Sequence, residues 1–187
     1  YEGEWKDHQI NGSGTFIYKN GDSYKGDFLN GNRHGKGTLI YKNGNSYKGD
    51  FLNGNRHGKG TLSFEEGGSY DGDWKGDKRD GSGTFIYKNG DIYKGDFLNG
   101  NRHGKGTCTF IDGCYEGEWK DNLQHGKGKL FDKNNKLLYE AVWHNGNCFN
   151  YPKANIVLTF LTKCVLQNFL NGKIINDNLV IIDSLYN

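Results

Sequence analysis

Tyr-Lys-Gly-Asp-Phe-Leu-Asn-Gly-Asn-Arg-His-Gly-Lys-Gly-Thr occupies residues 24–38, and the same letters return at residues 47–61 and 93–107. Related units open with a tyrosine at positions 1, 24, 47, 70, 93 and 115, and a degenerate seventh unit opens at 139. A fixed period of this length is the signature of a repeat array, in which each unit buries its apolar face against its neighbours. The unit therefore decides the fold.

Each unit has the pattern of two β-strands. Tyr24, Gly26 and Phe28 alternate with Lys25 and Asp27, and a period of two is typical of a strand with one packed face and one solvated face. In the second half of the unit one face carries Gly35, Gly37, Leu39 and Tyr41. The pattern predicts an all-β fold, a single-layer antiparallel meander of stacked β-hairpins.

Two kinds of connection alternate along this predicted meander. Asn-Gly pairs begin at positions 20, 43 and 89, and such pairs favour two-residue hairpin turns. We expect these tight turns to link one unit to the next. The segment 29–34, which also contains an Asn-Gly pair, is then the longer connection inside the unit.

The regular glycines predict a packing rule in which flat rings cover positions without a Cβ. The rings recur at Trp5, Phe28, Phe51, Trp74, Phe97 and Trp119, and the glycines that we expect beneath them are Gly12, Gly35, Gly58, Gly81, Gly104 and Gly126. One apolar residue per unit completes this column, namely Phe16, Leu39, Leu62, Phe85, Cys108 and Leu130. A single layer buries little core for each residue, so the aromatic face needs strong curvature or a cap.

Composition excludes several classes of protein. Thirty glycines with 14% aromatic residues and a single proline argue against both disorder and collagen. The net charge of +2 gives too weak a positive electrostatic field to predict nucleic-acid binding. Cys108, Cys114, Cys148 and Cys164 form no Cys-x-x-Cys pair, so we expect no metal site and favour reduced thiols and a cytoplasmic location.

The sequence divides into a repeat array, residues 1–150, and a C-terminal segment, residues 151–187. Apolar residues between 158 and 169 follow a helical spacing, which predicts a short mixed, mainly helical segment. Two interpretations stay open, a cap over the last hairpin and an oligomerisation helix. The chain opens inside the repeat pattern and contains no methionine, so we expect it to be a piece of a longer protein.

Two further motifs have a functional interpretation beside a structural one. Gly-x-Gly recurs in each unit but lacks the following helix of a phosphate-binding loop, so we read it as structural. A ladder of basic residues at the repeat period is a candidate for anionic lipid, formed by Arg33, His34, Arg56, His57, Arg102 and His103. The alternative is a solvated loop balanced by Asp27, Asp50 and Asp96. No histidine or carboxylate is singled out from the periodic ones, so no catalytic residue is expected.

The pattern Tyr-x-Gly-x-Trp/Phe, then Gly, then Gly-x-Gly, closely resembles the MORN (membrane occupation and recognition nexus) repeat, from residue 1 to about residue 150. The resemblance implies a single-layer sheet used as a scaffold, and it implies no cofactor. Such arrays occur in cytoskeletal and ciliary scaffolds of protists, membrane tethers, phosphoinositide kinases and a lysine methyltransferase. His8, Asp77 and Asn122 stand where the pattern has glycine after the aromatic residue, so we expect those loops to be less regular.

These observations predict a non-enzymatic scaffold or adaptor that binds a protein partner, a peptide or helix, through the aromatic groove. The candidate partner-binding residues are Tyr24, Phe28, Tyr47, Phe51, Tyr70, Trp74, Tyr93 and Phe97. This prediction requires that Tyr47→Ala or Phe51→Ala lowers the affinity for the partner without unfolding the array. The alternatives are a membrane tether that binds anionic phospholipid and the regulatory arm of a larger enzyme. Association with the cytoskeleton or a membrane, a homodimer and an AT-rich protist source are further expectations.

Overall fold

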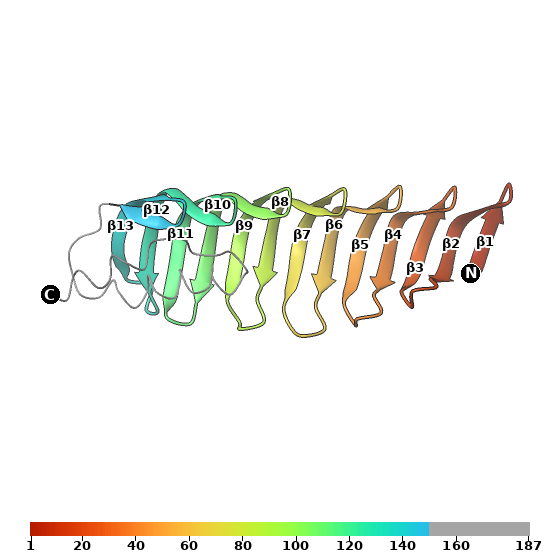
Figure 1. Cartoon of the computed structure of the whole chain (residues 1–187), viewed down its shortest axis with the longest axis horizontal. Helices are drawn as coiled ribbons and strands as arrows, with labels where there is room; N and C mark the ends of the chain where they lie inside the picture. The colour runs from red at the N-terminus through yellow and green to blue at the C-terminus, as the bar shows by residue number, and fades with distance from the viewer. Residues whose placement is uncertain (150–187) are drawn as a thin grey trace. The chain divides into compact units, whose positions relative to one another are not determined.

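The computed structural model describes residues 1–149, which form one unit built from fourteen antiparallel strands. The strands are β1 (Glu2–Lys6), β2 (Gln9–Ile17), β3 (Ser23–Leu29), β4 (Asn32–Ile40), β5 (Ser46–Leu52), β6 (Asn55–Ser63), β7 (Ser69–Lys75), β8 (Lys78–Ile86), β9 (Ile92–Leu98), β10 (Asn101–Phe110), β11 (Gly113–Lys120), β12 (Leu123–Asp132), β13 (Leu137–His144) and β14 (Asn147–Phe149). They lie in chain order in one sheet (Figure 1). The predicted single-layer antiparallel meander is confirmed, and the predicted helical segment at 151–187 lies outside the described residues.

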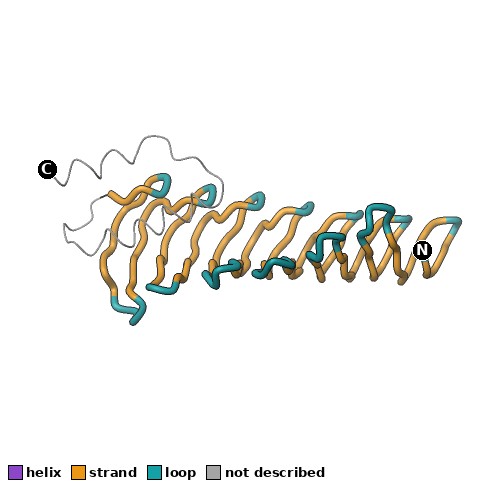
Figure 2. The backbone as a smooth tube through the Cα atoms, turned by 60° about the horizontal axis from the view of Figure 1, so that its bottom comes forward, coloured by secondary structure: helices purple, strands orange, loops and turns teal. Residues whose placement is uncertain are grey.

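The two kinds of turn are assigned the opposite way from the prediction. Within a unit the turn has two residues, Asn30 and Gly31, with φ of 48° and 79°, which is the left-handed conformation that a tight primed turn requires. The connection between units spans residues 41–45, and the Gly44 N–H donates to the Tyr41 carbonyl at 2.9 Å. Both kinds contain Asn-Gly, so the dipeptide alone did not distinguish them. The two sets of loops lie on opposite long edges of the sheet (Figure 2).

The first glycine of each Gly-x-Gly pair makes a bulge rather than a seat for a Trp or Phe ring. At Gly12, Gly35, Gly58, Gly81, Gly104 and Gly126 the φ angle lies between 57° and 112°. In unit two the strand register shifts at this point, and the Asp27 carboxylate accepts a hydrogen bond from the Lys36 N–H at 3.1 Å. A Cβ at Gly35 would lie 2.6 Å from that carboxylate. The prediction that rings cover these glycines was therefore wrong, because a carboxylate occupies the space.

The tyrosine that opens each unit lies over a different pair of glycines. A Cβ at Gly26 would approach the Tyr24 hydroxyl to 2.6 Å, and a Cβ at Gly37, directly across the ladder, would also meet the Tyr24 ring. The same hydroxyl donates to the Asp27 carbonyl at 3.0 Å. Tyr24 is fully buried as a result. The principle of a ring over glycine holds, with the tyrosine as the ring.

Aromatic contacts continue from unit to unit without a break. The Tyr24 ring meets Phe28 of its own unit at 5.0 Å and Phe51 of the next unit at 5.1 Å, both edge to face. Tyr47 repeats the arrangement with Phe51 and Trp74. Edge-to-face pairs contribute roughly 0.5–1.5 kcal/mol beyond the area that they bury. Each unit is thus joined to the next through its largest side chains.

Burial of these tyrosines predicts an alkaline unfolding transition. Burial raises the pKa of Tyr70 from 10.0 to about 12 and raises the pKa of Tyr24, Tyr47 and Tyr93 in the same direction. The unfolded chain therefore loses its phenolic protons first as the pH rises. The contribution of these tyrosines to stability should be present in full well below pH 10.0 and should fall progressively above it, as the pH approaches the folded pKa.

Ultraviolet absorbance of tyrosinate and far-UV circular dichroism, recorded in one pH titration, check this prediction. Ionisation of the buried tyrosines should coincide with loss of the sheet signal. Complete ionisation near pH 10 with an intact sheet would contradict the burial.

Candidate partner-binding face

The sheet has two faces of different character. The aromatic face carries the tyrosine that opens each unit, the aromatic residue four positions later and the apolar column of the following strand, as in Tyr24, Phe28 and Leu39. The polar face carries the alternate residues, as in Lys25, Thr38 and Asp27. A partner-binding site on the aromatic face depends on which of its side chains water can reach.

The eight predicted partner-binding residues are core residues. Tyr24, Tyr47, Tyr70 and Tyr93 are fully buried, and Phe28, Phe51, Trp74 and Phe97 are exposed by 3–5%. Rings buried to this extent by their own strands offer no contact surface. The expectation that they touch a partner directly conflicts with this burial. The physical cause of the burial is the edge-to-face chain, in which each tyrosine packs against an aromatic ring of the next unit.

A second aromatic row stays half-exposed on the same face. It consists of Phe16, Tyr18, Tyr41, Phe64, Phe85 and Tyr87, which lie near the ends of the first four units and in the connections that follow. Two of its pairs are close: Phe16 and Tyr18 at 4.7 Å between centroids, and Phe85 and Tyr87 at 4.5 Å. The prediction already placed Phe16 and Phe85 in the apolar column and Tyr41 on this face, but it did not recognise the row as a surface. The recurring aromatic residue two positions after the apolar column was the available signal.

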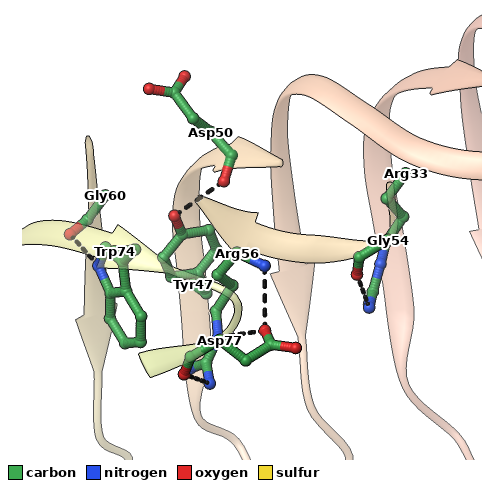
Figure 3. A network of polar contacts seen from close by, with 8 residues as sticks. All are labelled: Arg33, Tyr47, Asp50, Gly54, Arg56, Gly60, Trp74 and Asp77. Carbon is green, nitrogen blue, oxygen red and sulfur yellow. Dashed lines mark hydrogen bonds and ion pairs between the residues drawn. The ribbon is translucent and has the colours of Figure 1, made fainter. Parts of the chain in front are cut away.

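Arginines separate the buried rings from the second aromatic row. Arg33 lies 5.3 Å from the Phe51 ring centroid and 5.9 Å from that of Tyr18. Its guanidinium donates to the Gly54 carbonyl at 2.6 Å (Figure 3). The Gly54 N–H donates in turn to the Arg33 carbonyl at 2.9 Å. Arg79 and Arg102 hold the next turn in the same way, through the carbonyls of Gly100 and Asn122. Each arginine thus clamps its unit to the turn of the following unit.

Arg56 differs from the other arginines because it has an acidic partner. Its Nε and its backbone N–H both donate to the Asp77 carboxylate at 3.0 Å, and its Nη2 donates to the Asp77 carbonyl (Figure 3). Its guanidinium also lies 4.3 Å from the Trp74 ring centroid. Asp77 and Asn122 replace the turn glycine, and their φ values of 66° and 71° keep the regular turn. The expectation of irregular loops there was wrong, because these side chains bind the neighbouring arginine strand.

The predicted basic ladder does not form one surface. Arg33 lies opposite Phe28 on the aromatic face, whereas His34 lies opposite Asp27 on the polar face, because successive residues of a strand point to opposite sides. Arg56 and His57, and Arg102 and His103, are separated in the same way. The Nδ1 atoms of His34, His103 and His125 are buried and make no hydrogen bond within residues 1–149. The arginines of the ladder donate hydrogen bonds to the turns of the following units.

Ion pairs between neighbouring units lie on the polar face. Lys36 pairs with Asp50 at 2.5 Å, and Lys59 pairs with Asp73 at 2.6 Å. The hydrogen bond from Lys59 lowers the pKa of the Asp73 carboxyl.

A cavity of about 330 Å³ on this sheet is lined by residues that include His103, Glu118 and His125. Within residues 1–149 no group of three or more His, Cys, Asp or Glu side chains is arranged to hold a metal ion.

The described part of the chain contains no helix long and apolar enough to span a bilayer. On the aromatic face, half-exposed rings lie beside cationic groups.

Comparison with known proteins identifies the repeat units. The MORN repeat family model matches residues 1–23, 24–46, 47–69, 70–92, 93–114 and 115–136. The search of curated proteins finds no match. Among solved structures, the TCP domain of SAS-4 (dCPAP) of Drosophila melanogaster, in complex with a proline-rich motif of Ana2 (dSTIL), is similar with a TM-score of 0.44 and 15% identity, over 71% of this chain and 72% of that chain. A likeness of that strength carries no argument about function.

Proposed function

The chain belongs to the MORN repeat family, and on that premise we propose that it is a scaffold that binds a protein partner along its aromatic face. The contact residues are the second aromatic row rather than the buried rings. Proteins of this family are in general built from non-catalytic repeats. The cysteine pattern of the sequence favours the cytoplasm as the place where the scaffold acts.

The half-exposed aromatic row is the observation that carries this proposal. Tyr18, Tyr41, Phe64 and Tyr87 recur once in each of the first four units and retain partial exposure while the rings beside them are buried. Aromatic side chains bury large areas on binding and have few rotamers to freeze. Burial also raises the pKa of Tyr41 and Tyr87, so their phenols stay neutral and suit contacts with apolar and peptide groups.

Anionic lipid is less well supported as a partner. The arginines assigned to it hold turns, and the histidines lie on the opposite face, where Lys36 and Lys59 are paired with aspartates. Vesicle sedimentation with and without acidic lipid tests this alternative, and charge-dependent binding would favour it over the protein-binding scaffold.

Tyr41→Asp is the variant that tests the proposal. Peptides selected from a random display library on the wild-type chain should lose at least tenfold in affinity, because the carboxylate replaces a ring that the bound peptide covers. The fold should survive, since Tyr41 lies in a connection and is only half-buried. Titration of labelled peptides by fluorescence anisotropy measures the effect.

Lys48→Glu is the matched control. Lys48 is exposed on the polar face of β5, close in sequence to Tyr41, and its replacement also changes the charge. Peptide affinity should not depend on it. Equal losses for the two variants, or a selection that yields no peptide sensitive to Tyr41→Asp, would overturn the proposal.

A further inference from the structure

The aromatic face repeats at a distance that discriminates among peptide conformations. Neighbouring strands of a sheet lie about 4.8 Å apart, so units of two strands repeat about every 9.6 Å. A polyproline II helix turns once in three residues and rises about 9.3 Å in doing so. It therefore presents the same side to every unit with a mismatch of only about 0.3 Å.

Other conformations do not match this repeat. An α-helix rises about 1.5 Å per residue and recovers its facing side after seven residues, at about 10.5 Å. An extended strand recovers it after two residues, at about 6.6 Å. Over three units both would drift out of register with the second aromatic row. Polyproline II also leaves its backbone carbonyls without internal hydrogen bonds, so they can accept from side chains.

The aromatic face also carries positive charge. Within residues 1–149, Arg33 and Arg79 make no ion pair; each donates one hydrogen bond through Nη2, to a turn carbonyl. Their guanidiniums are half-buried against rings at 5.3 and 5.4 Å. Burial lowers the pKa of Arg79, which reflects a charge that lacks full solvation. A carboxylate that reaches such a group gains more than one that reaches an exposed lysine.

We propose that the partner segment is an acidic, proline-rich peptide in the polyproline II conformation, lying along the repeat axis with its rings on the second aromatic row and its carboxylates on the arginines. This inference rests on the proposed scaffold function and names the chemistry of its ligand. Arg33 and Arg79 are two units apart, about 19 Å, which equals six residues of polyproline II. Arg56 lies between them, already neutralised by Asp77.

Three labelled fifteen-residue probes test the inference by fluorescence anisotropy. Repeats of Glu-Pro-Pro match both conformation and charge, Lys-Pro-Pro repeats reverse the charge, and Glu-Gly-Ser repeats keep the charge without the conformation. The Glu-Pro-Pro probe should bind at least tenfold more tightly than either control. Binding of Glu-Gly-Ser with equal affinity would overturn the inference.

Asp77→Asn provides an independent and opposite test. Asn122 occupies the equivalent turn and accepts the Arg102 N–H at 2.8 Å, so asparagine fits here without loss of the turn. Because this substitution frees Arg56 from its carboxylate, the affinity for the Glu-Pro-Pro probe should rise about fivefold. Arg79→Gln should lower that affinity about fivefold. Unchanged affinity in folded Asp77→Asn protein would contradict the proposal.

The two proposals fail separately. If random peptides sensitive to Tyr41→Asp are recovered but Glu-Pro-Pro repeats do not bind, the scaffold function stands and the polyproline II inference falls. If no peptide depends on Tyr41, both fall.

Discussion

Gly49→Ala is expected to lower the free energy of unfolding by about 3 kcal/mol or more. The new Cβ would lie 2.5 Å from the Gly60 Cα and from the Lys59 carbonyl oxygen, and 2.6 Å from the Tyr47 hydroxyl. Two of these three atoms belong to the backbone of the paired strand β6, so no rotamer change relieves the clash. The strands must separate, which breaks ladder hydrogen bonds as well as ring contacts. Urea unfolding followed by circular dichroism measures the loss.

Gly54→Asn is the control that separates a clash from the loss of a glycine. Gly54 lies in the turn that follows β5 with φ of 85°, and the nearest atom to a Cβ there is 3.8 Å away. Units four and six carry Asp77 and Asn122 at this position in the same conformation. The control should change stability by about 1 kcal/mol or less. Similar losses for the two variants would show that Gly49 is not held by close packing.

Tyr47→Ala should destabilise the chain by about 4 kcal/mol. The ring is fully buried, and its removal takes away edge-to-face contacts with Phe51 at 5.1 Å and Trp74 at 5.2 Å. It also leaves the Asp50 carbonyl without the hydroxyl that donates to it at 3.0 Å. Chemical unfolding followed by tryptophan fluorescence reports the change, because Trp74 lies against the missing ring.

Tyr47→Phe divides this loss into its parts. It keeps the ring and removes only the hydroxyl, so the expected cost is about 1 kcal/mol. The sequence alone suggested that Tyr47→Ala weakens a partner and leaves the array folded. An alanine variant as stable as the phenylalanine variant would restore that suggestion and contradict the core position of the ring.

Much of the fold followed from residues whose physical role is local. The alternation in Tyr24 to Phe28 defined a strand and its faces, and the period of the tyrosines defined the order of the sheet. Both signals depend on one residue and its near neighbours. They were sufficient for the meander and for the apolar column that contains Leu39.

What remained unpredicted depends on pairs of strands. Asn30-Gly31 and Asn43-Gly44 are the same dipeptide, and only the pairing of the strands on either side makes the first a two-residue turn. The sides taken by Arg33 and His34 likewise follow from strand pairing, and the burial of Phe51 depends on Tyr24 of the preceding unit. The predicted contact residues are buried for this reason. The solvent exposure of a ring depends on the neighbouring units of the array, whereas the repeat pattern describes one unit alone.

The edge-to-face contact between units has one more consequence. Tyr24 meets Phe51 at 5.1 Å and Tyr70 meets Phe97 at 5.0 Å, so the junctions are nearly interchangeable. A hairpin of unit two would fit against unit five almost as well as against unit three. Each hairpin therefore pairs with its neighbour in sequence because the chain links the two. A five-residue connection keeps the next hairpin at high local concentration, whereas pairing with a more distant hairpin closes a longer loop and costs more entropy. The order of the units in the array is therefore determined by the short connections, because the contacts at the junctions barely distinguish one unit from another.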